Sequence, residues 1–197
     1  MIAGAASLAA LPAHAQAQAF DYRNHAAYRA WTDPPEGAGK APLEAMLETG
    51  ESQISLGDWM GGRPAIIALW ATWCSPCLIE KAGEALMSKR LKAANARLQI
   101  LIIQAYDEKP LNQARFLLKR LGGGDLDNTR ATPEAEAAFS KHFGPARPGR
   151  DEPYMPSLMI ADAEGNELAR SVGVMSGPDR LKDYWYDDAT FEFLSRF

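Results

Sequence analysis

Cysteine is nearly absent from this chain, because only Cys74 and Cys77 occur among its 197 residues. A disulfide between them would close a loop of four residues, and so short a loop adds little stability. The pair is therefore better explained by redox chemistry or by metal binding than by a structural crosslink. Histidine is also scarce, with three residues, and a zinc site needs about four ligands. We expect neither a resident metal nor a cofactor.

An excess of basic residues is also lacking. The chain has 21 Lys and Arg against 25 Asp and Glu, which gives a formal net charge of -4. Proteins that bind nucleic acids rely on a basic surface, so we do not expect a nucleic-acid partner. The length and the hydrophobic content of 47% suit one domain with a substantial core.

Charge of either sign is missing from residues 1–19. The apolar run Ile2–Leu11 is too short to cross a bilayer as a helix, and the following Ala13–Ala15 fits the small-x-small pattern of a signal cleavage site. No cysteine lies there to carry a lipid anchor, and the usual basic start is missing, which leaves open a start upstream of Met1. We interpret residues 1–19 as the signal peptide of a periplasmic protein; the alternative is an Ala-rich first helix or tail.

The stretch from Ala65 to Leu91 organises the rest of the chain. Ile66–Trp70 is an apolar run typical of a buried strand, and after a short turn it leads to Cys74–Cys77 and a segment rich in helix formers. A second apolar strand is predicted over residues 98–105. Two such strands joined by a helix predict a right-handed βαβ unit with parallel strands.

The remaining patterns predict short elements around this unit. We expect short helices over 20–31 and 41–49, a strand over 53–56, a turn over 57–62, helices over 110–121 and 132–143, a short strand or loop over 125–130, a loop over 144–153, a β-hairpin over 157–172, and helical segments over 178–186 and 189–197. This order predicts an α/β fold with a mixed central sheet flanked by helices on both faces.

The segment Trp70–Cys77, with the sequence WATWCSPC, resembles the active-site signature of the thioredoxin superfamily. With Ile54–Asp58 before it, the segment looks most similar to the TlpA/ResA branch of exported thiol-disulfide oxidoreductases. A Trp-Cys-x-Pro-Cys motif at a strand-helix junction is a specific signal. The resemblance covers about residues 53–197. The resemblance implies a thioredoxin-like domain over 51–197; the composition and local patterns before it give the predicted signal peptide over 1–19 and an N-terminal helical extension over 20–50.

The two cysteines are the predicted catalytic residues. Cys74 lies at or just before a helix N-terminus, where free N–H groups and the helix dipole favour the thiolate. Cys77, one turn inside the helix, would resolve the mixed disulfide that Cys74 forms with a substrate. Pro76 suits the first helical turn, where its missing N–H costs little, and Ser75 and Pro76 together would tune the redox potential.

The resemblance also assigns residues around the pair. In this superfamily a cis-proline lies against the cysteines and helps to dock the substrate, and Pro156 is the matching residue. Met155 would contact the thiols or the partner, or only pack. We expect Trp73 to be partly exposed beside Cys74, and Trp70 to be a core residue. Further rim contacts are expected from Tyr154, Ser157 and the loop 144–153.

The chain departs from the family pattern at two positions. Relatives often carry Asp or Asn at the position of Ala68, and a helix-kinking proline at the position of Ala82. Without a polar group at Ala68, proton transfer to or from Cys77 needs another route. Glu80, three residues after Cys77, matches an acidic residue common in this branch, and is either that proton acceptor or an exposed helix residue.

The predicted function is disulfide exchange with exported partner proteins. The sequence does not indicate which class of partner protein is the substrate. The resemblance favours a reductant, in cytochrome c maturation or copper-site assembly, whose electrons would come from a donor such as a membrane protein. We expect a monomer. One alternative is a Cu(I) carrier that uses Cys74, Cys77 and Met155, because soft sulfur ligands suit Cu(I). Another is a thioredoxin-fold scaffold without turnover.

Overall fold

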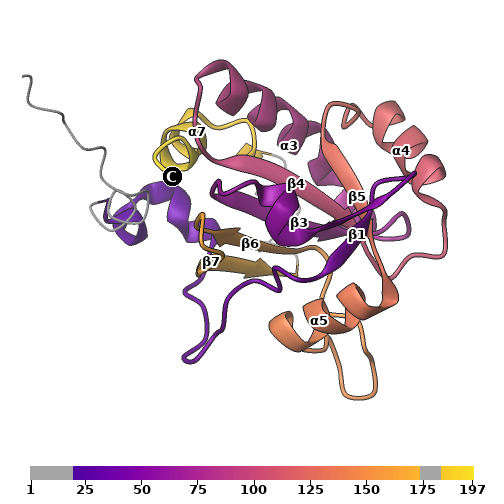
Figure 1. The fold of residues 1–197 in the computed structure, drawn as a ribbon. Helices are drawn as coiled ribbons and strands as arrows, with labels where there is room; N and C mark the ends of the chain where they lie inside the picture. The colour runs from indigo at the N-terminus through magenta and orange to yellow at the C-terminus, as the bar shows by residue number, and fades with distance from the viewer. Residues whose placement is uncertain (1–19, 174–182) are drawn as a thin grey trace, which may run out of the picture.

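A single mixed sheet forms the centre of the computed structural model, which describes residues 20–173 and 183–197. The described strands lie in the order β2-β1-β5-β4-β3-β6-β7 (Figure 1). Their bounds are β1 Met46–Glu48, β2 Gln53–Ser55, β3 Ala65–Trp70, β4 Gln99–Gln104, β5 Asp127–Ala131, β6 Ser157–Ala161 and β7 Glu167–Val172. The predicted α/β fold with a mixed sheet between helices is confirmed.

Helices cover both faces of this sheet (Figure 1). Those with residues in the core on one face are α3, α4 and α7, and those on the other face are α2 and α5. Their bounds are α2 Leu56–Met60, α3 Ser75–Ala93, α4 Leu111–Arg120, α5 Pro133–Phe143 and α7 Asp188–Leu194. No helix within the described ranges has both the length and the apolar character that crossing a membrane requires.

Strand β3 is the central strand, and all of its residues are buried. It runs parallel to β4 and antiparallel to β6. Ile66, Ala68 and Trp70 point into the core beneath α3, whereas Ile67 and Leu69 point into the core beneath α5. A strand that is covered on both faces needs apolar residues at every position, which explains the continuous run. The predicted βαβ unit, with α3 between β3 and β4, is confirmed.

The short helix predicted over 41–49 is wrong. Met46–Glu48 is strand β1, which pairs antiparallel with β2 on one side and with β5 on the other. Leu47 is fully buried while Met46 is exposed, which is the alternation of a strand. Pairing with segments distant in sequence decides the conformation here, and three residues are too few for a local pattern to show it.

Two further segments differ from their predictions in type. The turn predicted over 57–62 contains the short helix α2, whose N-terminus is capped by the Ser55 side chain and whose C-terminal Gly61 adopts a left-handed φ of 60°. The helix predicted over 20–31 is a pair of 3₁₀ turns, Tyr22–Asn24 and Ala26–Ala30. The segment 125–130, open between strand and loop, holds β5.

The N-terminal arm packs on the sheet edge and on the C-terminal segment. Thr32 forms a β-bridge with Arg170 of β7, and the Trp31 indole donates a hydrogen bond of 2.6 Å to the hydroxyl of buried Tyr184. The predicted boundary at residue 50 falls between β1 and β2 of the sheet. The predicted signal peptide and residues 178–182 of the predicted helical segment over 178–186 lie outside the described residues.

Candidate active site

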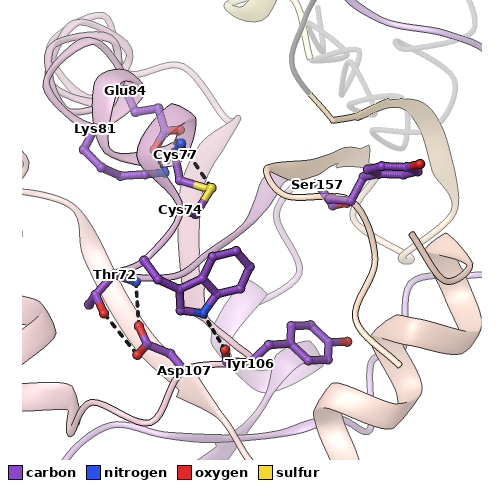
Figure 2. Close-up of a disulfide and its surroundings, with 10 residues drawn as sticks. Thr72, Cys74, Cys77, Lys81, Glu84, Tyr106, Asp107 and Ser157 are labelled. Carbon is purple, nitrogen blue, oxygen red and sulfur yellow. Dashed lines mark hydrogen bonds and ion pairs between the residues drawn. A yellow bond between two sulfur atoms is a disulfide. The ribbon is translucent and has the colours of Figure 1, made fainter. Parts of the chain in front are cut away.

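Cys74 and Cys77 form a disulfide at the start of α3 (Figure 2). Cys74 is the N-cap residue of this helix, and its Sγ accepts a hydrogen bond of 3.2 Å from the N–H of Cys77. Pro76 lies in the first turn, where no N–H is required. The predicted position of Cys74 at a helix N-terminus is confirmed. The free N–H groups and the helix dipole there stabilise a thiolate on Cys74.

A second chain segment reaches the same end of the sheet. The peptide bond between Met155 and Pro156 is cis. Ser157, the next residue, pairs with Leu69 near the C-terminal end of β3, and from that end the chain continues to Cys74. Met155 is half-buried and packs against the cores on both faces of the sheet, one of which contains the two cysteines. The Met155–Pro156 segment and the cysteine motif therefore lie at the same end of β3.

The turn before Cys74 is held by the loop that follows β4, which sequence reasoning missed. Asp107 accepts hydrogen bonds from the Thr72 N–H at 2.6 Å and the Thr72 hydroxyl at 3.1 Å. The Trp73 indole donates to the Tyr106 carbonyl oxygen at 2.7 Å (Figure 2). Because β3 and β4 are parallel, their carboxyl ends meet at one edge. The available signal in the sequence was the polar pair Tyr106 and Asp107, which follows β4 after Ala105.

Helix α5 in turn supports this loop. Tyr106 adopts a left-handed φ of 54°, which is uncommon for a residue other than glycine. Its N–H donates to the Glu136 carboxylate at 2.5 Å, and its hydroxyl donates to the Glu136 carbonyl oxygen at 2.5 Å. Burial raises the pKa of Glu136, and the Tyr106 N–H opposes that rise. Both faces of the sheet thus contribute to the position of the active-site turn.

The outer rim of the site is apolar. The exposed fraction is 55% for Trp73 and 50% for Tyr154, so the predicted exposure of Trp73 is confirmed. Trp70 is fully buried, as predicted, and its indole donates to Asn128 Oδ1 at 3.0 Å. Ser157, predicted as a rim contact, is fully buried, and its hydroxyl donates to the Tyr154 carbonyl oxygen at 2.5 Å.

The inner side of the disulfide is charged. Ala68 is buried between Ile102 and Leu158 of the neighbouring strands, so β3 contributes no polar group there. Glu80 has an exposed fraction of only 1%. Its interpretation as an exposed helix residue is therefore wrong. It lies one helical turn after Cys77, on the buried side of α3, where residues three apart are neighbours.

Two more charged residues lie on this buried side. Lys81 Nζ donates to both carboxylate oxygens of Glu84, at 2.8 and 2.7 Å, and both side chains are completely buried (Figure 2). The Lys81 Nζ also lies 5.9 Å from the centre of the Trp70 ring. At Gly83 an added Cβ would come within 2.6 Å of the Trp185 Cβ. Glycine thus permits the C-terminal segment to pack closely on this turn of α3.

Glu80 has no ion-pair partner among residues 20–173 and 183–197. No hydrogen-bond donor among the described residues reaches either of its carboxylate oxygens. Burial and then the negative charge of Glu84 raise the pKa of Glu80 to about 8, and Lys81 opposes this rise. The side chain is therefore mostly protonated at neutral pH. It can hold a proton one helical turn from Cys77.

No group of three or more His, Cys, Asp and Glu residues in the described part of the chain could hold a metal ion. The sulfur atoms that the Cu(I) alternative requires are those of the disulfide and of Met155, and two of the three are bonded to each other.

Comparisons with known proteins agree with this geometry. The Redoxin family model matches residues 23–185, so the match also includes most of the N-terminal arm. No curated protein matches the chain.

Solved structures with the same fold include disulfide-exchange proteins. A thiol:disulfide interchange protein of the thioredoxin family from Chlorobium tepidum has 22% identity and a TM-score of 0.52, and the match covers 76% of this chain and 99% of that one. A DsbF homologue from Corynebacterium diphtheriae has 17% identity and a TM-score of 0.53, with 78% and 90% covered. A secreted disulfide oxidoreductase from Mycobacterium tuberculosis, homologous to E. coli DsbE, has 16% identity and a TM-score of 0.50, with 74% and 96% covered.

The family match covers well over half of the chain, and the neighbours share its fold. The disulfide lies at the N-terminus of α3, where the free N–H groups favour the Cys74 thiolate that disulfide exchange uses. The chain belongs to the Redoxin family of the thioredoxin superfamily and is a thiol-disulfide oxidoreductase.

Proposed function

We propose that this protein is an exported reductant that opens disulfides in partner proteins through Cys74 and Cys77. The observation that carries the proposal is the position of Cys74 as the N-cap of α3, with its Sγ accepting a backbone N–H. A thiolate at this place is stabilised and is the attacking species in disulfide exchange. The uncharged N-terminal stretch with its cleavage-like pattern supports export. The neighbour from Mycobacterium tuberculosis is described as secreted.

The reaction begins from the reduced pair. The Cys74 thiolate attacks one sulfur of the substrate disulfide, a mixed disulfide forms, and the other substrate sulfur leaves as a thiolate that takes up a proton. In the minor fraction of the protein in which Glu80 is ionised at neutral pH, the Cys77 thiol passes its proton to the Glu80 carboxylate, and the Cys77 sulfur attacks Cys74 Sγ. The Cys74–Cys77 disulfide forms, the mixed disulfide breaks, and the second substrate sulfur leaves. Two electrons have moved from the protein to the substrate.

The remaining roles follow from position. The segment from Tyr154 to Pro156 and the exposed Trp73 form the apolar rim on which the substrate chain docks. The partners are proteins whose cysteines must be reduced after export, as in cytochrome c maturation or copper-site assembly. An oxidising periplasm requires an electron donor, such as a membrane protein, to return the pair to its dithiol form. The protein acts as a monomer.

Reduction of insulin disulfides by the purified protein tests the activity. The wild-type protein is expected to catalyse the reaction with dithiothreitol as electron source, Cys74→Ser to be inactive although folded, and Cys77→Ser to accumulate the mixed disulfide. Stoichiometric Cu(I) binding without any thiol exchange would contradict the enzyme and favour the carrier. Activity that survives in Cys74→Ser would contradict the assignment of the nucleophile.

The direction of electron flow needs a separate measurement. Equilibration with glutathione buffers gives the reduction potential of the Cys74–Cys77 pair. We expect a value below about -200 mV, on the reducing side of the superfamily. A value near -120 mV, typical of a strong oxidant, would contradict the reductant while leaving the oxidoreductase intact.

A further inference from the structure

The buried ion pair of Lys81 and Glu84 has no evident role in stability. Both side chains are completely buried, on the helix that begins with the cysteines. Removing two charges from water is costly, and replacing such a pair by apolar residues of similar size is often neutral or stabilising. The pair therefore needs another explanation, and its surroundings suggest one.

The pair lies on the same face of α3 as Cys77 and Glu80. The four residues are spaced i, i+3, i+4 and i+7, which places them along one stripe of the helix, and all four are buried. Each oxygen of Glu84 accepts a hydrogen bond from Lys81, whereas neither oxygen of Glu80 accepts one from any described residue. The Lys81 ammonium thus lies near the carboxyl groups of both Glu80 and Glu84 and, of the two, is hydrogen-bonded only to Glu84.

Among the described residues, the other elements packed on this face bring no charged side chain against Glu80. Strands β3 and β4 contain no ionisable side chain, and the turn after α4 meets Lys81 with Gly123. The C-terminal segment contributes Trp185 and Tyr186, which lie against Gly83, and the neighbouring Tyr184, whose hydroxyl accepts the hydrogen bond of the Trp31 indole. Burial is the largest cause that raises the pKa of Glu80; the negative charge of Glu84 and a carboxyl–carboxyl hydrogen bond with Glu84 also raise it, and the charge of Lys81 opposes the rise.

We propose that Glu84 is a positioning residue that captures Lys81 and so keeps Glu80 free of a cation, able to hold and release the proton of Cys77. This inference rests on the proposed function, in which Cys77 resolves the mixed disulfide. When Cys77 attacks Cys74 Sγ, its proton goes to the Glu80 carboxylate. When the disulfide is reopened, Glu80 returns that proton to the Cys77 sulfur. Without Glu84, Lys81 would pair with Glu80 and hold it as a permanent carboxylate.

The test uses reduced full-length protein and the aromatic disulfide 5,5′-dithiobis(2-nitrobenzoate). The first thionitrobenzoate released reports attack by Cys74, and the second reports resolution by Cys77. We expect Glu84→Gln to move the pH inflection of the second phase downward by about one unit or more, a tenfold change in proton affinity, and to leave the first phase unchanged. Glu134→Gln on α5, which changes an exposed glutamate, is the matched control and should move neither phase.

Two further variants separate the explanations. In a Glu80→Gln background, adding Glu84→Gln should cause no further shift. In Lys81→Met/Glu84→Leu the cation is absent as well, so the inflection should stay near that of the wild type. An unshifted profile in Glu84→Gln would overturn the inference, as would an equal shift in the double variant. A wild-type protein without any second phase would instead overturn the resolving role of Cys77.

A measurement on the wild type covers the case in which Glu84→Gln does not fold. With carboxyl carbons of glutamate labelled, NMR titration of the oxidised and reduced protein follows each buried group. We expect Glu80 to titrate with a pKa of about 8 in the oxidised protein and its titration to respond to the redox state. If no buried glutamate responds to the redox state, the inference is wrong.

Discussion

The two sides of the Cys74–Cys77 disulfide reverse the usual distribution of side chains. On the outer side, Trp73 and Tyr154 expose aromatic surface to solvent, whereas on the inner side Glu80, Lys81 and Glu84 are buried. Charged residues are almost never fully buried unless they are paired, and here one of the three is not. The difference fits the proposal that the outer side recognises a protein chain and that the inner side handles a proton.

This contrast predicts how each side responds to mutation. On the outer side, the ring of Tyr154 is half exposed, so changes there should alter substrate use and leave stability nearly intact. The inner residues are embedded in the core under α3, so changes there should alter stability and proton transfer.

The largest effect is expected for Lys81→Met. This change leaves Glu80 and Glu84 as two buried carboxyl groups with no cation between them, and breaking a buried ion pair by removing one partner costs about 3–5 kcal/mol. Urea unfolding of the oxidised protein at pH 7 measures it. Lys81→Met/Glu84→Leu should recover most of the loss, because the pair is then replaced by apolar groups. If Lys81→Met alone is as stable as the wild type, the inner side does not differ from the outer side in its effect on stability.

The sequence was sufficient for the centre of the fold. Continuous apolar runs identified β3 and β4, and the motif between them located Cys74 at a helix N-terminus. It was not sufficient for β1, whose three residues owe their conformation to pairing with β2 and β5. No local pattern contains that information.

On the inner side, Glu80 was a candidate from the sequence, whereas Lys81 and Glu84 were missed for a different reason. In α3 the apolar Ile79 and Leu86 are exposed, while Lys81 and Glu84 are buried. An interpretation by hydrophobic periodicity places the opposite face of this helix inward. Asp107 was missed because its partner Thr72 is 35 residues away, so only the parallel arrangement of β3 and β4 brings the two together.

The second prediction concerns the pH dependence of stability. The pKa of Glu80 is raised in the folded protein from 4.5 to about 8, so its protonated form is favoured by folding. The contribution to stability is full below pH 4.5 and is lost as the pH rises through about 8. We expect the free energy of unfolding of the wild type, relative to Glu80→Gln, to fall by about 2 kcal/mol between pH 6 and pH 8. Urea unfolding at several pH values checks this, and a difference that does not change with pH would show that Glu80 is not titrating.

The third prediction concerns the loop that holds the turn before Cys74. Asp107→Ala removes the acceptor of two hydrogen bonds from Thr72, and the Thr72 N–H loses a charged partner. We expect a loss of about 1–2 kcal/mol in stability and a slower attack by Cys74 in the first phase of the aromatic disulfide reaction. Asp125→Asn, an exposed carboxylate in the turn before β5, is the control. Unchanged kinetics in a destabilised Asp107→Ala would mean that the loop supports the fold without positioning the cysteine.

The smallest effect on the fold, and the most specific one on the substrate, is expected for Tyr154→Ala. The ring is 50% exposed, so its loss should change stability by no more than about 0.5 kcal/mol. It does, however, remove apolar surface beside Pro156, where a substrate chain would dock. We expect the rate of insulin reduction at low insulin concentration to fall several-fold. The reaction with the small aromatic disulfide, which needs no docking surface, should be unchanged.

Phe116→Ala on α4 is the matched control for this variant, because Phe116 is 64% exposed and equally aromatic but lies on another element. If both variants slow insulin reduction equally, the loss reflects general apolar surface rather than a docking rim. If Tyr154→Ala slows the small disulfide as much as insulin, the ring acts on Cys74 itself. The outer side would then share in the chemistry that the present contrast assigns to the inner side alone.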